Sequence, residues 1–243
     1  MTEYQSPAGM NFKPGLKRQD DMLTLVLAEA ALECIPRKLQ DHNSVLSHAE
    51  RLRKDPSEIL LDNSWHYAAM KGIKDEIKRG RPDLVHASIL AATAIPLYQN
   101  NRIRIYVHTI GDHVIRLGAG TNIPRSYHRF AGLVEKLFRE EVIQSGQRTL
   151  LEMHRETLPE LIDGLEPSSV VGLSTRGKPS SFEHVASILD EHACVIIGGF
   201  QKGHFSETTQ GKIESMYSVG DMSYDAHVVI SRLAYEYEKT IFM

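Results

Sequence analysis

The sequence is poor in cysteine and contains no long hydrophobic run. Its 243 residues include only Cys34 and Cys194, both in apolar segments, so we expect two reduced, buried thiols and no disulfide framework. No apolar run approaches the roughly 18 residues that span a bilayer, and residues 1–21 lack the apolar core of a signal peptide. These absences exclude a disulfide-stabilised secreted domain and a membrane protein, and they favour a cytoplasmic one.

An excess of positive charge is also missing. Acidic residues number 31 against 28 lysines and arginines, so the net charge of −3 gives no general signal for nucleic-acid binding. Basic residues nevertheless gather in two segments, one with Lys71, Lys74, Lys78, Arg79 and Arg81, and one with Arg125, Arg129, Lys136 and Arg139. The second set lies within about 40° of one direction on a predicted helix. Each cluster alone is typical of a solvated surface, but two in a slightly acidic protein also suit a patch that binds a phosphate backbone.

The apolar pattern predicts an α/β fold. We expect a strand at 23–27 running into a helix that Pro36 ends, a hairpin at 102–117, strands at 168–174 and 193–200, and helices at 84–97, 126–141, 181–191 and 225–242. The last helix has a stripe of apolar residues that we expect to be buried, namely Ala226, Val229, Ile230, Leu233, Ala234 and Tyr237. Fully apolar strands alternating with helices indicate a mostly parallel sheet covered on both faces. Residues 1–21 are expected to be a flexible leader, and 22–243 a single domain.

A glycine pair ends the apolar strand "ACVIIGGFQKGHF". Gly198 and Gly199, followed by Gly203, indicate a tight turn or a place where the backbone must approach another group closely. The segment "GLSTRGKPS" imitates a phosphate-binding loop, but Pro179 stands where that loop needs a serine or threonine for the metal, which disfavours a nucleotide triphosphatase. The histidines are scattered, so no metal site is expected.

Six segments, taken in their order along the chain, point to a known family: "LTLVLAEAALECIP", "ILLDNSWHYAAMKG", "RGRPDLVH", "IYVHT", "IPRSYHRFAGLVEKLF" and "VIIGGFQKGHFSE". Together they resemble the ribosome-biogenesis pseudouridine N1-methyltransferases of archaea and eukaryotes, which belong to the SPOUT superfamily. The resemblance covers the chain from about Leu23 to its end. It implies a SPOUT-type α/β sheet, a C-terminal trefoil knot at approximately 169–243 and a homodimer. It also implies a nucleolar location if the source is a eukaryote.

The resemblance implies S-adenosyl-L-methionine as the cofactor, held by the knot loops. Carried over onto this sequence, the cofactor-binding residues are Ser174, Thr175, Gly198, Gly199, Phe200, Gly203, Ser218, Val219, Met222 and Ser223. The glycines would let the backbone come within hydrogen-bond range of the cofactor. The implied substrate is a pseudouridine in a hairpin loop of small-subunit rRNA, and the implied RNA-binding residues are Arg81, Arg125 and Arg129.

Methyl transfer to N1 of pseudouridine also requires a group that takes the N1 proton. Asp62 and Asp112 are both candidates, and the sequence does not choose between them, so the catalytic residue is unknown; Asp83 is expected to have a structural role in its turn. The sequence departs from the family pattern at Asn122, at Ala94-Ile95 and at Gln201, Lys202 and His204. These departures keep a second hypothesis open, an RNA-binding ribosome assembly factor with weak or no methyltransferase activity. Other assembly factors are candidate partners under either hypothesis.

Overall fold

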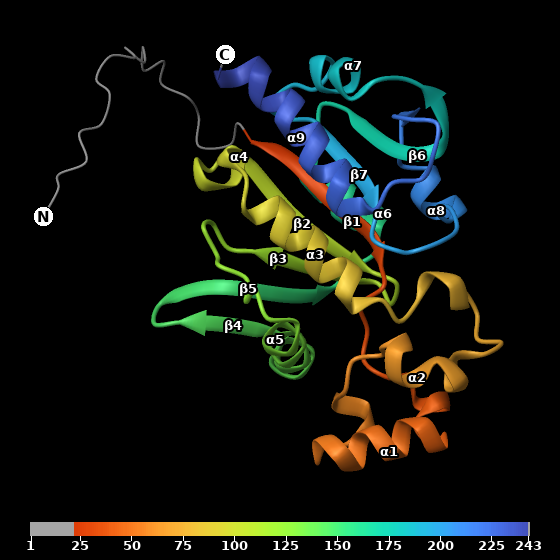
Figure 1. Ribbon diagram of the computed structural model, residues 1–243. Coiled ribbons are helices and arrows are strands. Elements are labelled where there is room, and N and C mark those ends of the chain that lie inside the picture. The colour runs from red at the N-terminus through yellow and green to blue at the C-terminus, as the bar shows by residue number, and fades with distance from the viewer. Residues whose placement is uncertain (1–21, 243) are drawn as a thin grey trace, which may run out of the picture.

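The computed structural model describes residues 22–242, and the leader expected at 1–21 lies outside them. The described chain forms an eight-stranded sheet in the order β4-β5-β3-β2-β1-β7-β6-β8 (Figure 1). The strands are β1 Leu23–Ala30, β2 Ile103–Thr109, β3 His113–Leu117, β4 Val142–Ser145, β5 Arg148–Arg155, β6 Val170–Pro179, β7 Cys194–Gly198 and β8 Ser215–Ser218. β2, β1, β7, β6 and β8 are parallel to one another, whereas β3, β5 and β4 form an antiparallel extension that begins beside β2.

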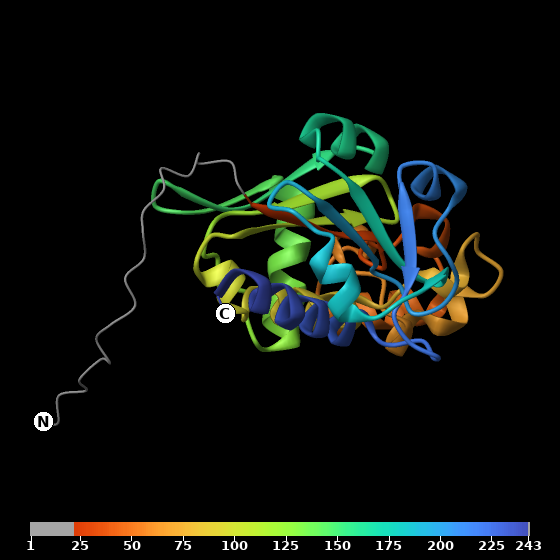
Figure 2. The same cartoon turned by 90° about the horizontal axis from the view of Figure 1, so that it is seen from above.

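Helices cover both faces of this sheet (Figure 2). One face packs against α3 Pro82–Thr93, α5 Tyr127–Glu140, α7 Phe182–Ser187 and α9 Ala226–Phe242. The other packs against α6 Leu158–Leu165 and the short α8 Glu207–Gln210. Every residue of β1 is buried because this central strand has a hydrophobic layer on each side. No helix among residues 22–242 is long and apolar enough to cross a membrane.

A smaller helical unit projects from the parallel half of the sheet (Figure 1). It contains α1 Asn43–Leu52 and α2 Asn63–Met70, with the short 3-10 turns Arg37–Leu39 and Pro56–Glu58. Its buried residues, which include Val45, Ile59 and Leu61, form a hydrophobic cluster separate from the two sheet layers. The 3-10 turn Glu76–Lys78 then leads the chain back to α3, while α4 Pro96–Gln99 follows α3.

Much of the predicted secondary structure is confirmed, including the hairpin of β2 and β3 and the parallel order of β1, β7 and β6. The buried residues of α9 are the six of the predicted stripe. The helix expected to end at Pro36 is wrong. β1 continues to Ala30, Glu29 takes a left-handed conformation with φ of 50°, and Cys34 pairs with Leu60 in an isolated bridge, so no helix forms there. Both cysteines are free, and burial raises the pKa of each thiol to about 12.

Candidate active site

Three chain segments meet in a cleft of about 350 Å³ beside the middle of β6 and the carboxyl ends of β7 and β8. The first is the middle of β6, where the pairing with β8 shifts register between Leu173 and Lys178. The second follows β7, and the third connects β8 to α9. Parallel strands end at the same edge of a sheet, so segments far apart in sequence come together here. Nine of the predicted cofactor-binding residues line this cleft: Ser174, Thr175, Gly198, Phe200, Gly203, Ser218, Val219, Met222 and Ser223.

Gly199, the tenth, does not line the cleft. Its N–H donates to the carbonyl of Ala28 and its carbonyl accepts from the N–H of Ala31, both at 2.8 Å. A Cβ at this position would lie 2.7 Å from the Cα of Ala30. Gly199 therefore allows the end of β7 to pack against β1. That it also contacts the cofactor stays a prediction. Gly198 does line the cleft, where its Cβ would lie 2.9 Å from the Cζ of Phe200.

A buried ion pair supports the wall made by Phe200 and Gly203. Lys78 Nζ lies 2.5 Å from the carboxylate of Glu29 and 4.8 Å from the centroid of the Phe200 ring. The second carboxylate oxygen of Glu29 accepts a hydrogen bond from the N–H of Ser206 at 2.7 Å. Burial alone would raise the pKa of Glu29, but the hydrogen bonds from Lys78 and Ser206 hold it below its usual value. The charge of Glu29 is therefore stabilised in the folded protein.

The first basic cluster is accordingly smaller at the surface than the sequence indicates. Lys78 is buried. Arg79 forms a bidentate ion pair with Glu33, in which Nε and Nη2 lie 2.6 and 2.5 Å from the two carboxylate oxygens. Lys71 and Lys74 remain exposed. In the second cluster, Lys136 pairs with Glu140, and Arg139 pairs with Glu58 and Glu140.

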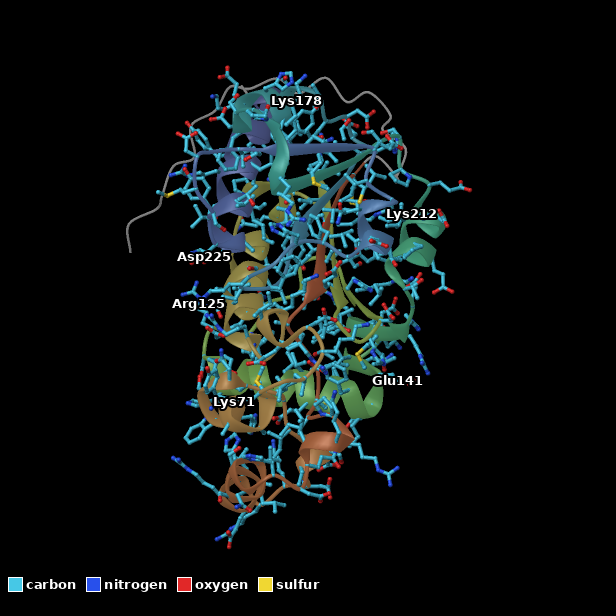
Figure 3. All side chains as sticks on the ribbon, turned by 90° about the vertical axis from the view of Figure 1, so that its right-hand side faces the viewer. Lys71, Arg125, Glu141, Lys178, Lys212 and Asp225 are labelled. Atoms are coloured by element: carbon cyan, nitrogen blue, oxygen red, sulfur yellow. The ribbon has the colours of Figure 1, made fainter. Side chains whose placement is uncertain are left out.

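Arg81 lies near the cleft, whereas Arg125 and Arg129 flank the first residues of α5. Arg81 makes a two-armed pair with Asp83, at 2.8 and 2.7 Å, and the cleft residue Asp225 is close enough to help raise the pKa of Arg81. Arg125 and Arg129 are exposed at the start of α5 and form no ion pair within residues 22–242. Figure 3 shows Asp225, Arg125 and Lys71 along one edge of the molecule, so basic side chains extend away from the cleft on that side. Asp83 pairs with Arg81 rather than capping α3, and its structural role stays a prediction.

The sequence matches the family model of the EMG1/NEP1 methyltransferases over residues 25–238. The chain belongs to this family. It is 37% identical over 222 residues to the ribosomal RNA small subunit methyltransferase Nep1 of Thermococcus sibiricus, covering 90% of this chain and 99% of that one. The Nep1 of Thermococcus onnurineus is 39% identical over 206 residues, 84% of this chain and 93% of the relative.

A solved structure agrees with these relatives. The crystal structure of Archaeoglobus fulgidus Nep1 bound to S-adenosylhomocysteine superimposes with a TM-score of 0.80 and 37% sequence identity. The match covers 89% of this chain and 97% of the other. The α/β fold and the family resemblance found in the sequence are therefore confirmed.

In this EMG1/NEP1 chain, neither carboxylate proposed from sequence as proton acceptor lines the cleft. Asp62 is buried, and its oxygens accept from the N–H of Ser64, at 2.8 Å, and from the hydroxyl of Tyr127. Burial and the bond to Asp62 raise the pKa of Tyr127, so the tyrosine stays the donor. Asp112 is exposed in the β2–β3 turn and contacts His108 Nε2 at 3.1 Å.

Sequence reasoning missed Asp225, the only carboxylate among the described residues that line the cleft. The sequence could have indicated Asp225 by its position, because it ends the loop that leads from the third cleft segment into α9. Residues on such loops often reach into a binding site. His204 was noted only as a departure from the family pattern. Its Nδ1 is buried without a hydrogen-bond partner within the described chain, and the residue lines the cleft.

The other departures fall at different distances from the cleft. Gln201 and Lys202 line it, so they change the chemistry of its wall. Ala94 follows the last residue of α3, whose 12 residues extend roughly 18 Å from the end beside Arg81. Asn122 is exposed before α5. Only the substitutions in the glycine segment therefore contact the candidate cofactor site directly.

Proposed function

We propose that this protein transfers a methyl group from S-adenosylmethionine to N1 of a pseudouridine in a hairpin loop of small-subunit rRNA. The observation that carries the proposal is the convergence of nine predicted cofactor-binding residues on one cleft, with Arg81 beside it. The relative from Archaeoglobus fulgidus was solved with S-adenosylhomocysteine, the product that remains when S-adenosylmethionine gives up its methyl group. The related archaeal proteins are named as small-subunit rRNA methyltransferases.

The residues that line the cleft fit such a cofactor. Leu84, Leu173, Ile197 and Val229 provide an apolar wall for a nucleoside ring, and the hydroxyl groups of Ser174, Thr175, Ser218 and Ser223 provide polar contacts. The unpartnered Nδ1 of His204 is a buried polar atom that a ligand can satisfy. Gly198 leaves room for the ring of Phe200 in the cleft wall, which a side chain at 198 would displace. Each of these features is expected of a preformed site for a polar nucleoside.

When bound, S-adenosylmethionine supplies a methyl group that forms a bond to N1, while the electron pair of the broken carbon–sulfur bond stays on sulfur. The proton of N1 must then go to a base of the protein or to water. We assign this role to Asp225, because it is the carboxylate that lines the cleft. Arg81, Arg125 and Arg129 would hold the phosphates on either side of the target nucleotide, since basic side chains position RNA through its backbone.

The proposal includes a C-terminal trefoil knot over approximately 169–243 and a homodimer. The knot rests on the family resemblance, and the elements of that region, β6, β7, β8 and α9, pack on one another or on α7 and α3. Sedimentation equilibrium at micromolar concentration tests the dimer, because a mass of one chain would contradict it.

Calorimetric titration with S-adenosylmethionine, followed by methyl-transfer assays on two matched RNA hairpins, tests the proposed function. One hairpin carries pseudouridine in its loop and the other carries uridine at the same position. Binding of the cofactor with transfer to the pseudouridine hairpin alone is the expected result, because uridine N1 is occupied by its glycosidic bond. Cofactor binding without transfer to either hairpin would favour the assembly-factor hypothesis. That hypothesis remains open because Gln201 and Lys202, which depart from the family pattern, line the cleft. Absence of cofactor binding would refute the proposal.

A further inference from the structure

Four large apolar side chains stand out among the described residues by their exposure, and two of them lie at the cleft. Met222, Tyr67, Ile77 and Tyr235 are exposed to 65%, 61%, 59% and 57%. Met222 lines the cleft, and the Cδ1 of Ile77 is 3.4 Å from where a Cβ of the cleft residue Gly203 would be. Exposed apolar groups that cluster beside a polar site usually mark a contact surface. Tyr67, on α2, does not line the cleft.

Tyr67 belongs to a helix face that begins beside Arg81. Asn63, Tyr67 and Lys71 are spaced four residues apart, so they follow one side of α2 to its end. The N–H of Asn63 donates to the carbonyl of Gly80 at 2.9 Å, which fixes the start of this face next to Arg81. Lys71 Nζ lies 5.8 Å from the centroid of the Tyr67 ring. Figure 3 shows Lys71 on the same edge of the molecule as Arg125 and Asp225.

The second exposed aromatic ring of α2 has a different environment. Trp65 stacks on His48 of α1, with ring centroids 4.6 Å apart and planes 13° apart, and the guanidinium of Arg51 lies 5.0 Å from its ring. Residues two apart on a helix point to different sides, so Trp65 and Tyr67 do not share a face. Trp65 therefore joins α2 to α1, whereas Tyr67 contacts only the flexible side chain of Lys71 among the aromatic and cation–ring pairs of residues 22–242.

We propose that the face Asn63–Tyr67–Lys71 is a second RNA contact, on which Tyr67 stacks an unpaired base next to the target nucleotide and Lys71 binds a phosphate. This inference rests on the proposed function. Single-stranded RNA loops are bound by stacking bases on aromatic rings beside basic side chains, and an exposed ring with an adjacent ammonium group supplies both contacts. Lys71 has no carboxylate partner within the described chain, so its charge is available to a phosphate.

Fluorescence anisotropy with a 5′-labelled RNA hairpin that carries pseudouridine in its loop tests the inference. We expect Tyr67→Ala to weaken binding at least about fivefold, the effect of removing one stacking ring, and Tyr67→Phe to bind like the wild type. Lys71→Gln should reduce the slope of log affinity against log salt by about 0.7, the value for one phosphate contact on single-stranded RNA. Tyr235→Ala is the matched control, because Tyr235 is similarly exposed and has Lys239 Nζ 5.6 Å from its ring, on α9.

Abasic substitutions in the RNA locate the stacked base. Each loop nucleotide next to the pseudouridine is replaced in turn by an abasic site, and each RNA is titrated with the wild type and with Tyr67→Ala. We expect one abasic site to weaken binding to the wild type but to have little further effect on Tyr67→Ala, because both changes remove the same contact. If the wild type binds and methylates the hairpin while Tyr67→Ala binds it equally well, this inference fails and the proposed function stands. Equal losses in Tyr67→Ala and Tyr235→Ala would also overturn it, and failure of the wild type to bind the hairpin would overturn both.

Discussion

Replacing Lys78 by methionine removes one partner of the buried ion pair behind the cleft while keeping a side chain of similar length. The side chains of Lys78 and Glu29 are only 11% and 6% exposed, so the remaining carboxylate of Glu29 would be left in a poorly solvated place. Removing one member of a buried pair destabilises proteins by about 3–5 kcal/mol. Glu29 keeps its bond to the N–H of Ser206, so we expect the lower end, about 3 kcal/mol, in urea unfolding at pH 7.

The pH dependence of this loss gives a second, more specific result. In the wild type the pKa of Glu29 is lowered, so its contribution to stability is present above the unfolded-state pKa and is lost as the pH falls through the folded-state pKa. In Lys78→Met, burial without the partner raises the pKa of Glu29, and the folded protein takes up a proton. The variant should therefore recover part of its stability between pH 7 and pH 5, whereas the wild type should not gain from this group.

The double variant Glu29→Gln/Lys78→Met is the control, because it removes both charges and leaves no unpaired carboxylate. We expect it to be more stable than Lys78→Met alone, since the cost of a broken pair comes from the charge left behind. Lys78→Met should also weaken cofactor binding, because Phe200 loses the ammonium group that lies 4.8 Å from its ring. A loss in stability below about 1 kcal/mol at pH 7, with no recovery at pH 5, would refute the assigned role of the pair.

Two further predictions separate packing from chemistry in the cleft. Gly199→Ala should lower the free energy of unfolding in urea by about 1–3 kcal/mol, because the new Cβ would meet Ala30. Gly198→Val should instead chiefly weaken the binding of S-adenosylmethionine, measured by calorimetry, because Gly198 lines the cleft. The reverse pattern would contradict the division between the two glycines. Asp225→Asn should retain cofactor affinity but lower the rate of methyl transfer roughly 100-fold or more, in line with the loss of a general base. An unchanged rate in a single-turnover assay would show that water or another group takes the N1 proton.

The parts of the fold that the sequence predicted are those in which one local pattern decides the structure. The apolar positions of α9 recur at helical spacing over 17 residues, so the buried stripe could be read directly. The parallel strands are short apolar runs rich in valine and isoleucine. A run of this kind between two helices is typical of a buried strand in a parallel sheet. The β4–β5 hairpin was missed because its strands are mostly polar or half-exposed, and its edge position depends on pairing with β3.

The errors at the candidate site have a different physical cause. The run at 23–36 has helix-forming alanine, leucine and glutamate, but pairing of β1 with both β2 and β7 outweighs that local preference. Lys78 and Arg79 looked like surface charges because their partners, Glu29 and Glu33, are 49 and 46 residues away in the sequence. An even longer separation in the sequence hid Asp225 from Arg81. Local patterns cannot assign such contacts, since they exist only after the sheet has brought the segments together.

The segment 71–81 connects the candidate cofactor cleft to the proposed RNA face. At its start, Lys71 reaches the ring of Tyr67 on the proposed RNA face. In its second half, Lys78 turns inward against Phe200 and Glu29, and at its end Arg81 stands beside Asp225. One short stretch of chain thus reaches the proposed RNA face and the wall of the candidate cofactor cleft, and it ends near the carboxylate of Asp225. If the proposed RNA face and the cofactor cleft both bind their ligands, an RNA contact that shifts this segment is expected to act on the wall of the cleft, and the linkage between the two ligands is then reciprocal.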